Sequence, residues 1–68
     1  MATTIGKVRW FSAPLGYGFI EQDDGTSVYV HYTALPNDER ERLRAGKRVE
    51  FDVDQTARGP QAVHVLPA

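Results

Sequence analysis

Turn-forming residues interrupt this chain so often that no long regular element fits between them. The 68 residues include 6 glycines and 4 prolines, spread along the length of the chain. Residues 23–26, Asp-Asp-Gly-Thr, are a strong hairpin signal. Residues 12–16 form a second turn or loop, in which Pro14 blocks continued sheet pairing. A chain divided in this way favours short strands joined by close turns over long helices.

The segments between the turns show the period-two alternation of β-strands. The clearest is 47–54, where Val49, Phe51 and Val53 alternate with charged residues. Strands are expected at residues 5–12, 17–22, 27–32, 47–54 and 61–66. Residues 33–46 lack this pattern and leave open a solvated loop, a helical turn at 34–35 or a short helix from 37–38 to 44.

Five short strands with close turns predict an all-β protein, a small five-stranded antiparallel barrel. Closure of the barrel removes the exposed edges that an open five-stranded sheet would leave. We expect a single domain over residues 1–68, with its core at about 5–66. The residues predicted to point inward are Val8, Gly18, Ile20, Val28, Val30, Val49, Phe51, Val53, Val63 and Val65, with Leu35 closing one end.

Composition excludes several classes of protein. The chain has no cysteine, which rules out disulfides, thiolate zinc sites and cysteine nucleophiles. No apolar run approaches membrane-spanning length, and the N-terminal residues lack a signal-peptide hydrophobic region, so a cytoplasmic protein without a membrane anchor is expected. His31 and His64 are not part of a triad spacing, and turn chemistry accounts for residues 23–25. We therefore expect no catalytic residues, no metal site and no cofactor.

Two neighbouring strands carry aromatic side chains on their outer face. With Ile20 and its alternating neighbours inward, Tyr17 and Phe19 point outward, and Tyr29 and His31 do the same on the next strand. An exposed apolar patch of this kind usually marks a binding site. Glycines at 16 and 18 suggest room beside the rings for a flat ligand.

Stacking platforms flanked by Lys7, Arg9 and Arg58 suit single-stranded nucleic acid, because each stacked base contributes about 1–3 kcal/mol. The chain has 8 basic and 9 acidic residues and a net charge of −1. Its pI is about 6.0, so something other than bulk charge must supply much of the affinity for nucleic acid. Two alternatives stay open: cross-strand aromatic pairing that only stabilises the hairpin, and a face that binds an extended or proline-rich peptide.

Four short motifs resemble the cold-shock domain of bacterial cold-shock proteins. They are Lys-Val-Arg-Trp-Phe at 7–11, Gly-Tyr-Gly-Phe-Ile at 16–20, Val-Tyr-Val-His-Tyr at 28–32 and Arg-Gly-Pro-Gln-Ala at 58–62, in the family's order. The resemblance implies an oligonucleotide-binding barrel that holds single-stranded RNA and DNA with limited sequence preference. It also implies a passive nucleic-acid chaperone that disfavours RNA secondary structure, with effects on transcription or translation. A monomer is the default expectation.

The same resemblance assigns the binding residues. The stacking residues carried over are Trp10, Tyr17, Phe19, Tyr29, His31 and Tyr32, with Arg9 and Arg58 as polar or phosphate contacts and Lys7 beside them. Strict alternation from Val8 and Val30 would turn Trp10 and Tyr32 inward. A bulge or a twist at the strand end must therefore re-aim these two rings.

The chain departs from the family pattern at several positions. Leu15 stands where the family usually has lysine, and Arg40 stands at a position where a loop aromatic is common. Serine replaces the family's usual residues at 12 and 27, and tyrosine replaces phenylalanine at 17, 29 and 32. Without that lysine and that loop aromatic, the chain lacks one charge contact and one stacking ring, so we expect it to bind more weakly than a typical member. The arginines at 40, 42 and 44 are candidates to compensate for part of this loss. The tyrosine hydroxyls add hydrogen-bonding groups at the rings.

Overall fold

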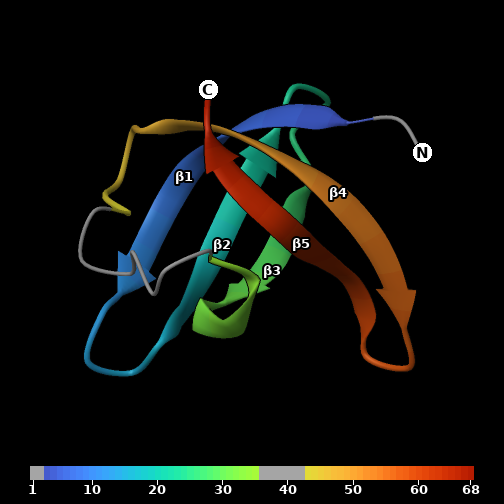
Figure 1. Cartoon of the computed structure of the whole chain (residues 1–68). Coiled ribbons are helices and arrows are strands. Elements are labelled where there is room, and N and C mark those ends of the chain that lie inside the picture. The colour runs from blue at the N-terminus through green and yellow to red at the C-terminus, as the bar shows by residue number, and fades with distance from the viewer. Residues whose placement is uncertain (1–2, 36–42) are drawn as a thin grey trace.

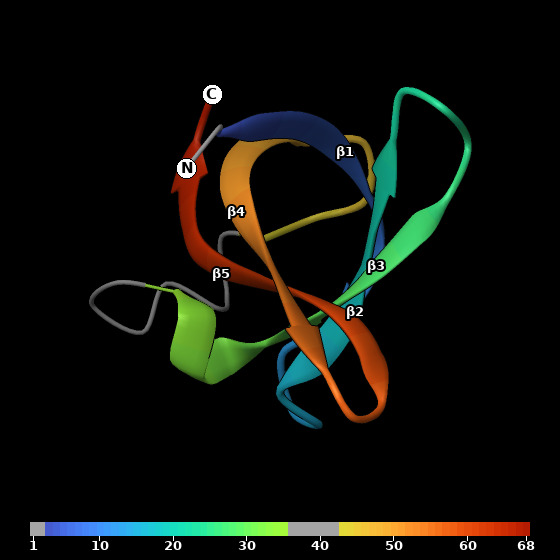
Figure 2. The same cartoon turned by 90° about the vertical axis from the view of Figure 1, so that its right-hand side faces the viewer.

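Five strands close into a barrel in the part of the chain that the computed structural model describes, residues 3–35 and 43–68 (Figure 1). The strands are β1 (Thr4–Ser12), β2 (Tyr17–Gln22), β3 (Ser27–His31), β4 (Arg48–Thr56) and β5 (Gly59–Pro67), with a 3-10 turn η1 (Tyr32–Ala34) after β3. Figure 2 shows the strands curving around a shared interior. The predicted all-β, five-stranded barrel is confirmed.

The strands follow one another around the barrel in the order β1-β2-β3-β5-β4, and β4 pairs again with β1. Four of these pairings are antiparallel. The fifth pairing, β3 with β5, is parallel, with Tyr29 opposite Gln61 and Val30 opposite Ala62. A parallel pair needs a long crossover connection, which here runs through β4. The expectation of antiparallel pairing therefore holds for every junction but this one.

Two tight hairpins shape the strand ends. Between β2 and β3, the backbone N–H and the hydroxyl of Thr26 both donate to Asp24 Oδ1, at 3.0 and 2.6 Å. These hydrogen bonds favour the carboxylate and lower the pKa of Asp24. Between β4 and β5, the Thr56 hydroxyl donates to the Gly59 carbonyl at 2.8 Å. This turn is so short that both strands extend beyond their predicted limits.

The connection after β3 matches the sequence only in part. The chain leaves the strand at His31, one residue earlier than expected, and residues 32–34 form the turn η1 rather than residues 34–35. Leu35 follows it as a buried residue. The short helix considered from 37–38 to 44 and the position of Arg40 fall largely or wholly outside the described residues.

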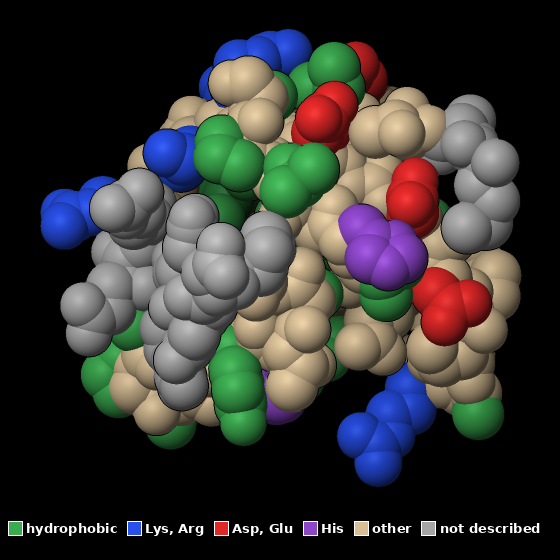
Figure 3. Space-filling view, viewed as in Figure 1, with side chains coloured by type: hydrophobic (Ala, Val, Ile, Leu, Met, Phe, Trp, Pro, Cys, Tyr) green, Lys and Arg blue, Asp and Glu red, His purple; other side chains and the backbone are tan. Residues whose placement is uncertain are grey.

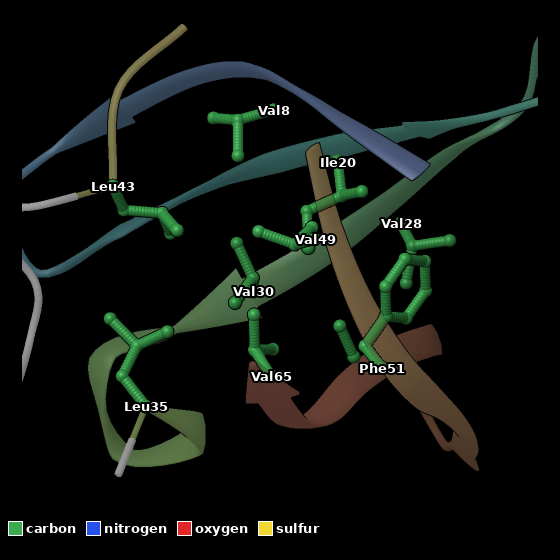
Figure 4. Packing of buried hydrophobic residues seen from close by; sticks show 10 residues of the cluster. Val8, Ile20, Val28, Val30, Leu35, Leu43, Val49, Phe51 and Val65 are labelled. Atoms are coloured by element: carbon green, nitrogen blue, oxygen red, sulfur yellow. The ribbon is translucent and has the colours of Figure 1, made fainter. Parts of the chain in front are cut away.

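Aliphatic side chains and one phenylalanine fill the interior (Figure 4). The buried hydrophobic residues are Val8, Ile20, Val28, Val30, Leu35, Leu43, Val49, Phe51, Ala62 and Val65. All were predicted to point inward except Leu43 and Ala62. Gly18 is also buried, and Val53 is partly buried against the core, as expected. Figure 4 shows Leu35 near one end of the cluster and Phe51 and Val28 near the other.

The prediction that Val63 belongs to the core is wrong. His64 adopts a positive φ of 53°, and the β4–β5 register shifts between Glu50 and Asp52. Two residues of β5, rather than one, therefore lie between the inward positions Ala62 and Val65. Val63 is left half-buried. His64 faces outward, with 78% of its side chain exposed.

Candidate nucleic-acid interface

Six rings from four successive elements form a continuous row on the outside of the barrel, called here the aromatic face. Its members are Trp10 from β1, Tyr17 and Phe19 from β2, Tyr29 and His31 from β3, and Tyr32 from η1. All are half-buried except Trp10, which is 42% exposed. Five of the six backbones belong to paired strands, so the sheet holds most of the row in place.

The rings contact one another from one end of the row to the other. The Trp10 centroid lies 5.4 Å from that of Tyr17 and 5.7 Å from that of Phe19. Tyr29 lies 5.9 Å from Tyr17 in a stacked arrangement and 6.0 Å from Phe19 edge to face. His31 continues the row at 6.5 Å from Tyr29. Each ring keeps its neighbours in place, so the face is formed before any ligand arrives.

Cross-strand pairing explains why four of these rings share one side. Phe19 is opposite Tyr29, and Tyr17 is opposite His31, in the β2–β3 ladder. Residues directly opposite each other point to the same side of a sheet. Their neighbours Ile20 and Val30 are fully buried on the inner side. The predicted outward direction of these rings agrees with the structure.

A β-bulge turns Trp10 to the same side. Val8 is opposite Ile20, but Trp10 is opposite Phe19, so β1 has one extra residue, Arg9, at this point. The bulge that the sequence requires for Trp10 to point outward is therefore present.

Tyr32 reaches the row by a different route. The strand has ended at His31, and Tyr32 begins η1. Its ring packs partly against the core and lies with its centroid 4.5 Å from that of His31.

Position 18 requires glycine because the backbone of β1 lies close to it, not because a ligand needs space there. A Cβ atom at Gly18 would lie 2.3 Å from the Trp10 carbonyl oxygen and 2.7 Å from the Phe11 Cα. The suggestion that this glycine makes room beside the rings is therefore wrong, because its missing side chain faces the barrel wall. Gly16 is buried in the turn with a φ of 80°, a conformation that favours glycine.

Two arginines border the aromatic face. Arg9 Nη1 donates to the Ser27 hydroxyl at 3.2 Å, which draws the guanidinium from β1 across β2 toward β3. Arg58 lines a hollow of about 310 Å³ beside the rings of Phe19 and Tyr29. The rest of this hollow is lined by Thr56, Gly59, Pro60 and Gln61. A base and its phosphate could contact ring and guanidinium together here.

Lys7 points to the outer side of the barrel, the side that carries Phe19. It is opposite Glu21 on one side and Arg48 on the other. These residues line a separate hollow of about 300 Å³ together with Gly6, Gln22, Asp23 and Gly25. The structure therefore groups the six rings with Arg9 and Arg58, and it places Lys7 on the same outer side, in a hollow lined by residues of both charges.

The acidic residues of β4 lie on another side of the barrel. Glu50, Asp52 and Asp54 alternate with the inward residues of that strand. Figure 3 shows acidic side chains gathered on the side where β4 and β5 face the viewer. Asp52 Oδ2 lies 3.3 Å from His64 Nδ1 in this region. These three carboxylates belong to β4, whereas the rings and Arg9 belong to β1, β2, β3 and η1.

Gln61 was missing from the predicted site. It lines the hollow with Arg58 and is opposite Tyr29 in the parallel β3–β5 pair. The one sequence feature that pointed to Gln61 was its place in the motif at 58–62. Its position beside the ring of Tyr29 follows only from the parallel pairing of β3 with β5. Ser27, which holds Arg9, was noted only as a departure from the family pattern.

Residues 3–35 and 43–68 contain no group of three or more histidine, cysteine or acidic side chains placed to hold a metal ion. No helix in the described part of the chain is long and apolar enough to cross a membrane.

A closed five-stranded barrel with an outward row of aromatic rings defines an oligonucleotide-binding barrel. The 'Cold-shock' DNA-binding domain family matches residues 4–68. The chain is 49% identical over 61 residues to "Cold shock-like protein CspC" of Bacillus cereus, covering 90% of this chain and 94% of that protein. It is 48% identical over 63 residues to "Cold shock protein CspC" of Bacillus subtilis, covering 93% and 96%. A "Cold shock-like protein" of Thermotoga maritima is 45% identical over 60 residues, covering 88% and 91%.

The chain belongs to the cold-shock domain family. Nucleic-acid binding is the general function of this family, and its members are not enzymes. The resemblance seen in the four sequence motifs is thereby confirmed over nearly the whole chain.

Proposed function

We propose that this protein binds single-stranded RNA and DNA with limited sequence preference by stacking bases on the aromatic face. The observation that carries the proposal is the continuous, solvent-accessible row of rings from Trp10 to Tyr32. Every base has a π-face, so stacking of this kind tolerates sequence, and each stack contributes about 1–3 kcal/mol. Bases in a duplex are already stacked and do not offer their faces, so the face favours unpaired strands.

Charge plays a smaller part in the proposed binding. Arg9 and Arg58 border the rings and are the candidates for phosphate contacts. With two to four phosphate contacts, the affinity for a single strand should fall with salt at a log–log slope of roughly −1.4 to −2.8. This modest slope is compatible with a net charge of −1, because stacking supplies the larger part of the free energy.

The proposed action on RNA is passive. A protein that binds only the unpaired state shifts the equilibrium between paired and unpaired RNA by mass action. No nucleotide hydrolysis is needed, since the free energy comes from binding. We propose that the protein works in this way as a cytoplasmic, monomeric nucleic-acid chaperone. Effects on transcription or translation would follow from the RNA structures that it keeps open.

Fluorescence of Trp10 tests the proposal directly, because this is the chain's one tryptophan and lies on the aromatic face. We expect saturable quenching by a short oligothymidine, with little response to the matching duplex, and a salt slope in the range given above. Absence of both quenching and backbone amide shifts with the single strand would contradict the proposal. Saturable binding of a proline-rich peptide with almost no salt dependence would then favour the peptide-binding alternative.

A further inference from the structure

His31 is held at one of its two ring nitrogens by a residue just after it in the chain. The backbone N–H of Thr33 donates to His31 Nδ1 at 3.4 Å, and the Thr33 hydroxyl oxygen lies 2.9 Å from the same nitrogen. His31 thus serves as the N-terminal cap of η1, in extended backbone conformation with φ −111° and ψ 153°. Thr33 itself is exposed and has no place in the row of rings.

This arrangement decides which nitrogen carries the proton. A backbone N–H can only donate, so Nδ1 must present its lone pair to Thr33. In the neutral imidazole the proton is then on Nε2, and the Thr33 hydroxyl can donate to Nδ1 as well. The hydrogen bond made by one nitrogen of a histidine in this way fixes the role of the other.

The free nitrogen faces solvent. Within residues 3–35 and 43–68, no acceptor is placed to bond Nε2, and no buried side-chain polar atom is left without a partner. Nε2–H is therefore accessible to water on the side of the ring away from Thr33. The imidazole itself is fixed between the rings of Tyr29 and Tyr32, with centroids at 6.5 and 4.5 Å.

We propose that Thr33 is a positioning residue that orients the His31 imidazole, so that Nε2–H is a fixed hydrogen-bond donor to an acceptor atom of the bound strand. The inference rests on the proposed function of the aromatic face and adds a polar contact to it. A phenylalanine at position 31 could stack equally well, so the donor is what distinguishes histidine there. The acceptor is a base carbonyl or ring nitrogen, or a phosphate oxygen, since all three accept from an N–H.

Whether Thr33 orients the His31 imidazole can be tested in the free protein, without any ligand. Nitrogen-15 spectra of the His31 ring, recorded well above the ordinary histidine pKa of about 6.5, should show Nδ1 unprotonated and Nε2 protonated. In Thr33→Val the shape at 33 is kept and the hydroxyl is lost, so the Nδ1 resonance should move toward that of an unbonded nitrogen. Thr33→Ser should restore the original position. A protonated Nδ1 in the unmodified neutral protein would overturn the assignment.

Whether His31 donates a hydrogen bond to the bound strand can be tested by a double-mutant cycle, with a short oligothymidine as the ligand. Loss of one hydrogen bond corresponds to a drop in affinity of about two- to tenfold, which we expect for His31→Phe. Thr33→Val should cause a smaller drop, because it removes the hydroxyl but keeps the backbone N–H that donates to Nδ1. If Thr33 acts through His31, adding Thr33→Val to His31→Phe should cause no further loss. Equal losses from Thr33→Val in both backgrounds would overturn the proposal, and so would full affinity in His31→Phe.

A modified strand identifies the acceptor. Replacing the thymines by a non-polar isostere of the same shape keeps stacking and removes the base acceptors. If His31→Phe then causes no loss, the acceptor is on the base, and if the loss persists, it is on the sugar–phosphate backbone. Failure of the unmodified protein to bind any single strand would instead contradict the proposed function, while the ring spectra would still decide how Thr33 positions His31.

Discussion

Trp10 lies opposite Phe19 in the β1–β2 ladder, with ring centroids 5.7 Å apart, although a regular ladder continuing from Val8 and Ile20 would place Arg9 there. The extra residue has two effects. It turns Trp10 outward to join the aromatic face, and it sets Phe11 opposite Gly18, where Phe11 packs against the core. The bulge thus divides two adjacent aromatic residues between the aromatic face and the interior.

Removal of one ring from the middle of the row should weaken binding and leave the fold intact. Phe19 contacts the rings of both Trp10 and Tyr29 and is half-buried on the outer side. We expect Phe19→Ala to reduce the free energy of binding to oligothymidine by about 1–3 kcal/mol, and Tyr29→Ala by a similar amount. Fluorescence titration measures the loss, and urea unfolding checks stability.

Leu66→Ala is the matched control for these ring deletions. It also removes a large exposed apolar side chain, 44% exposed, but on β5 outside the aromatic face. Its affinity should equal that of the unmodified protein. If Phe19→Ala unfolds the protein and leaves the binding of the remaining folded fraction unchanged, the assignment of this ring to the outer face is wrong.

Truncation on the inner side of the same hairpin should have the reverse effect. Val30 is next to Tyr29 in sequence but fully buried, so Val30→Ala opens a cavity in the core. We expect a loss of about 2 kcal/mol in the free energy of unfolding, with unchanged affinity in the folded protein. Chemical denaturation and titration at low temperature measure the two quantities. A weakened affinity without a stability change would show that the two faces of β3 are assigned in reverse.

Gly18 should not tolerate even a methyl group. Its Cβ would approach the Trp10 carbonyl oxygen and the Phe11 Cα, which are backbone atoms that cannot move aside singly. We expect Gly18→Ala to lower stability by about 1–3 kcal/mol or more, and to change the Trp10 emission because the bulge must shift. Leu15→Ala, at a turn residue 67% exposed, is a control that should be near neutral. Native stability in Gly18→Ala would contradict the close approach of β1 and β2.

Alternation accounts for most of the architecture, and the residues that break it account for what the sequence did not predict. Val49 and Phe51 in one strand, and Ile20 in another, show the period of two plainly, and their directions were predicted correctly. Alternation alone does not reveal the bulge at Arg9. It was expected only because the family resemblance assigns Trp10 to the stacking residues, which must point outward. The bulge at His64 had no such support, so Val63 was placed inside when Ala62 belongs there.

The site was predictable where it depends on neighbouring strands and unpredictable where it depends on distant ones. Tyr17, Phe19, Tyr29 and His31 share a face because a short hairpin joins their strands, and that hairpin is visible in the sequence. The contact of Gln61 with the same face depends on the parallel β3–β5 pairing, which no local pattern specifies.

A lysine at position 15 should strengthen the proposed binding through charge alone. Leu15 is 67% exposed in the turn just before Tyr17, so a longer polar side chain fits there without repacking. One added phosphate contact steepens the log–log salt slope for a single strand by about 0.7. We therefore expect Leu15→Lys to bind oligothymidine more tightly at low salt, with the advantage shrinking as salt rises. Leu15→Gln, which adds polarity without charge, should show neither change. Equal salt slopes for Leu15→Lys and the unmodified protein would contradict a phosphate contact at this turn.

The β2–β3 hairpin should lose stability in acid because of Asp24. Its pKa is lowered from the ordinary 3.8, first by the Thr26 hydroxyl and then by the Thr26 backbone N–H, both of which bond the carboxylate. The folded pKa is therefore below the unfolded one. Asp24 contributes stability in full above the unfolded pKa, and that contribution is lost as the pH falls through the folded pKa. At neutral pH, Asp24→Ala should be less stable than the unmodified protein, and the gap should close in strong acid.

Urea unfolding of both proteins from neutral pH down to below the folded pKa measures this gap. Asp24→Asn provides the control, since its amide oxygen can still accept from Thr26 but cannot titrate, so its difference from Asp24→Ala should stay constant across the same range. A pH-independent gap between the unmodified protein and Asp24→Ala would show that the carboxylate charge does not contribute to the turn.

Because the hairpin carries Phe19 on one strand and Tyr29 on the other, loss of the Asp24 contact should also loosen the aromatic face at that end. We therefore expect the affinity of Asp24→Ala for oligothymidine to fall slightly, and the effect to be smaller than that of deleting either ring.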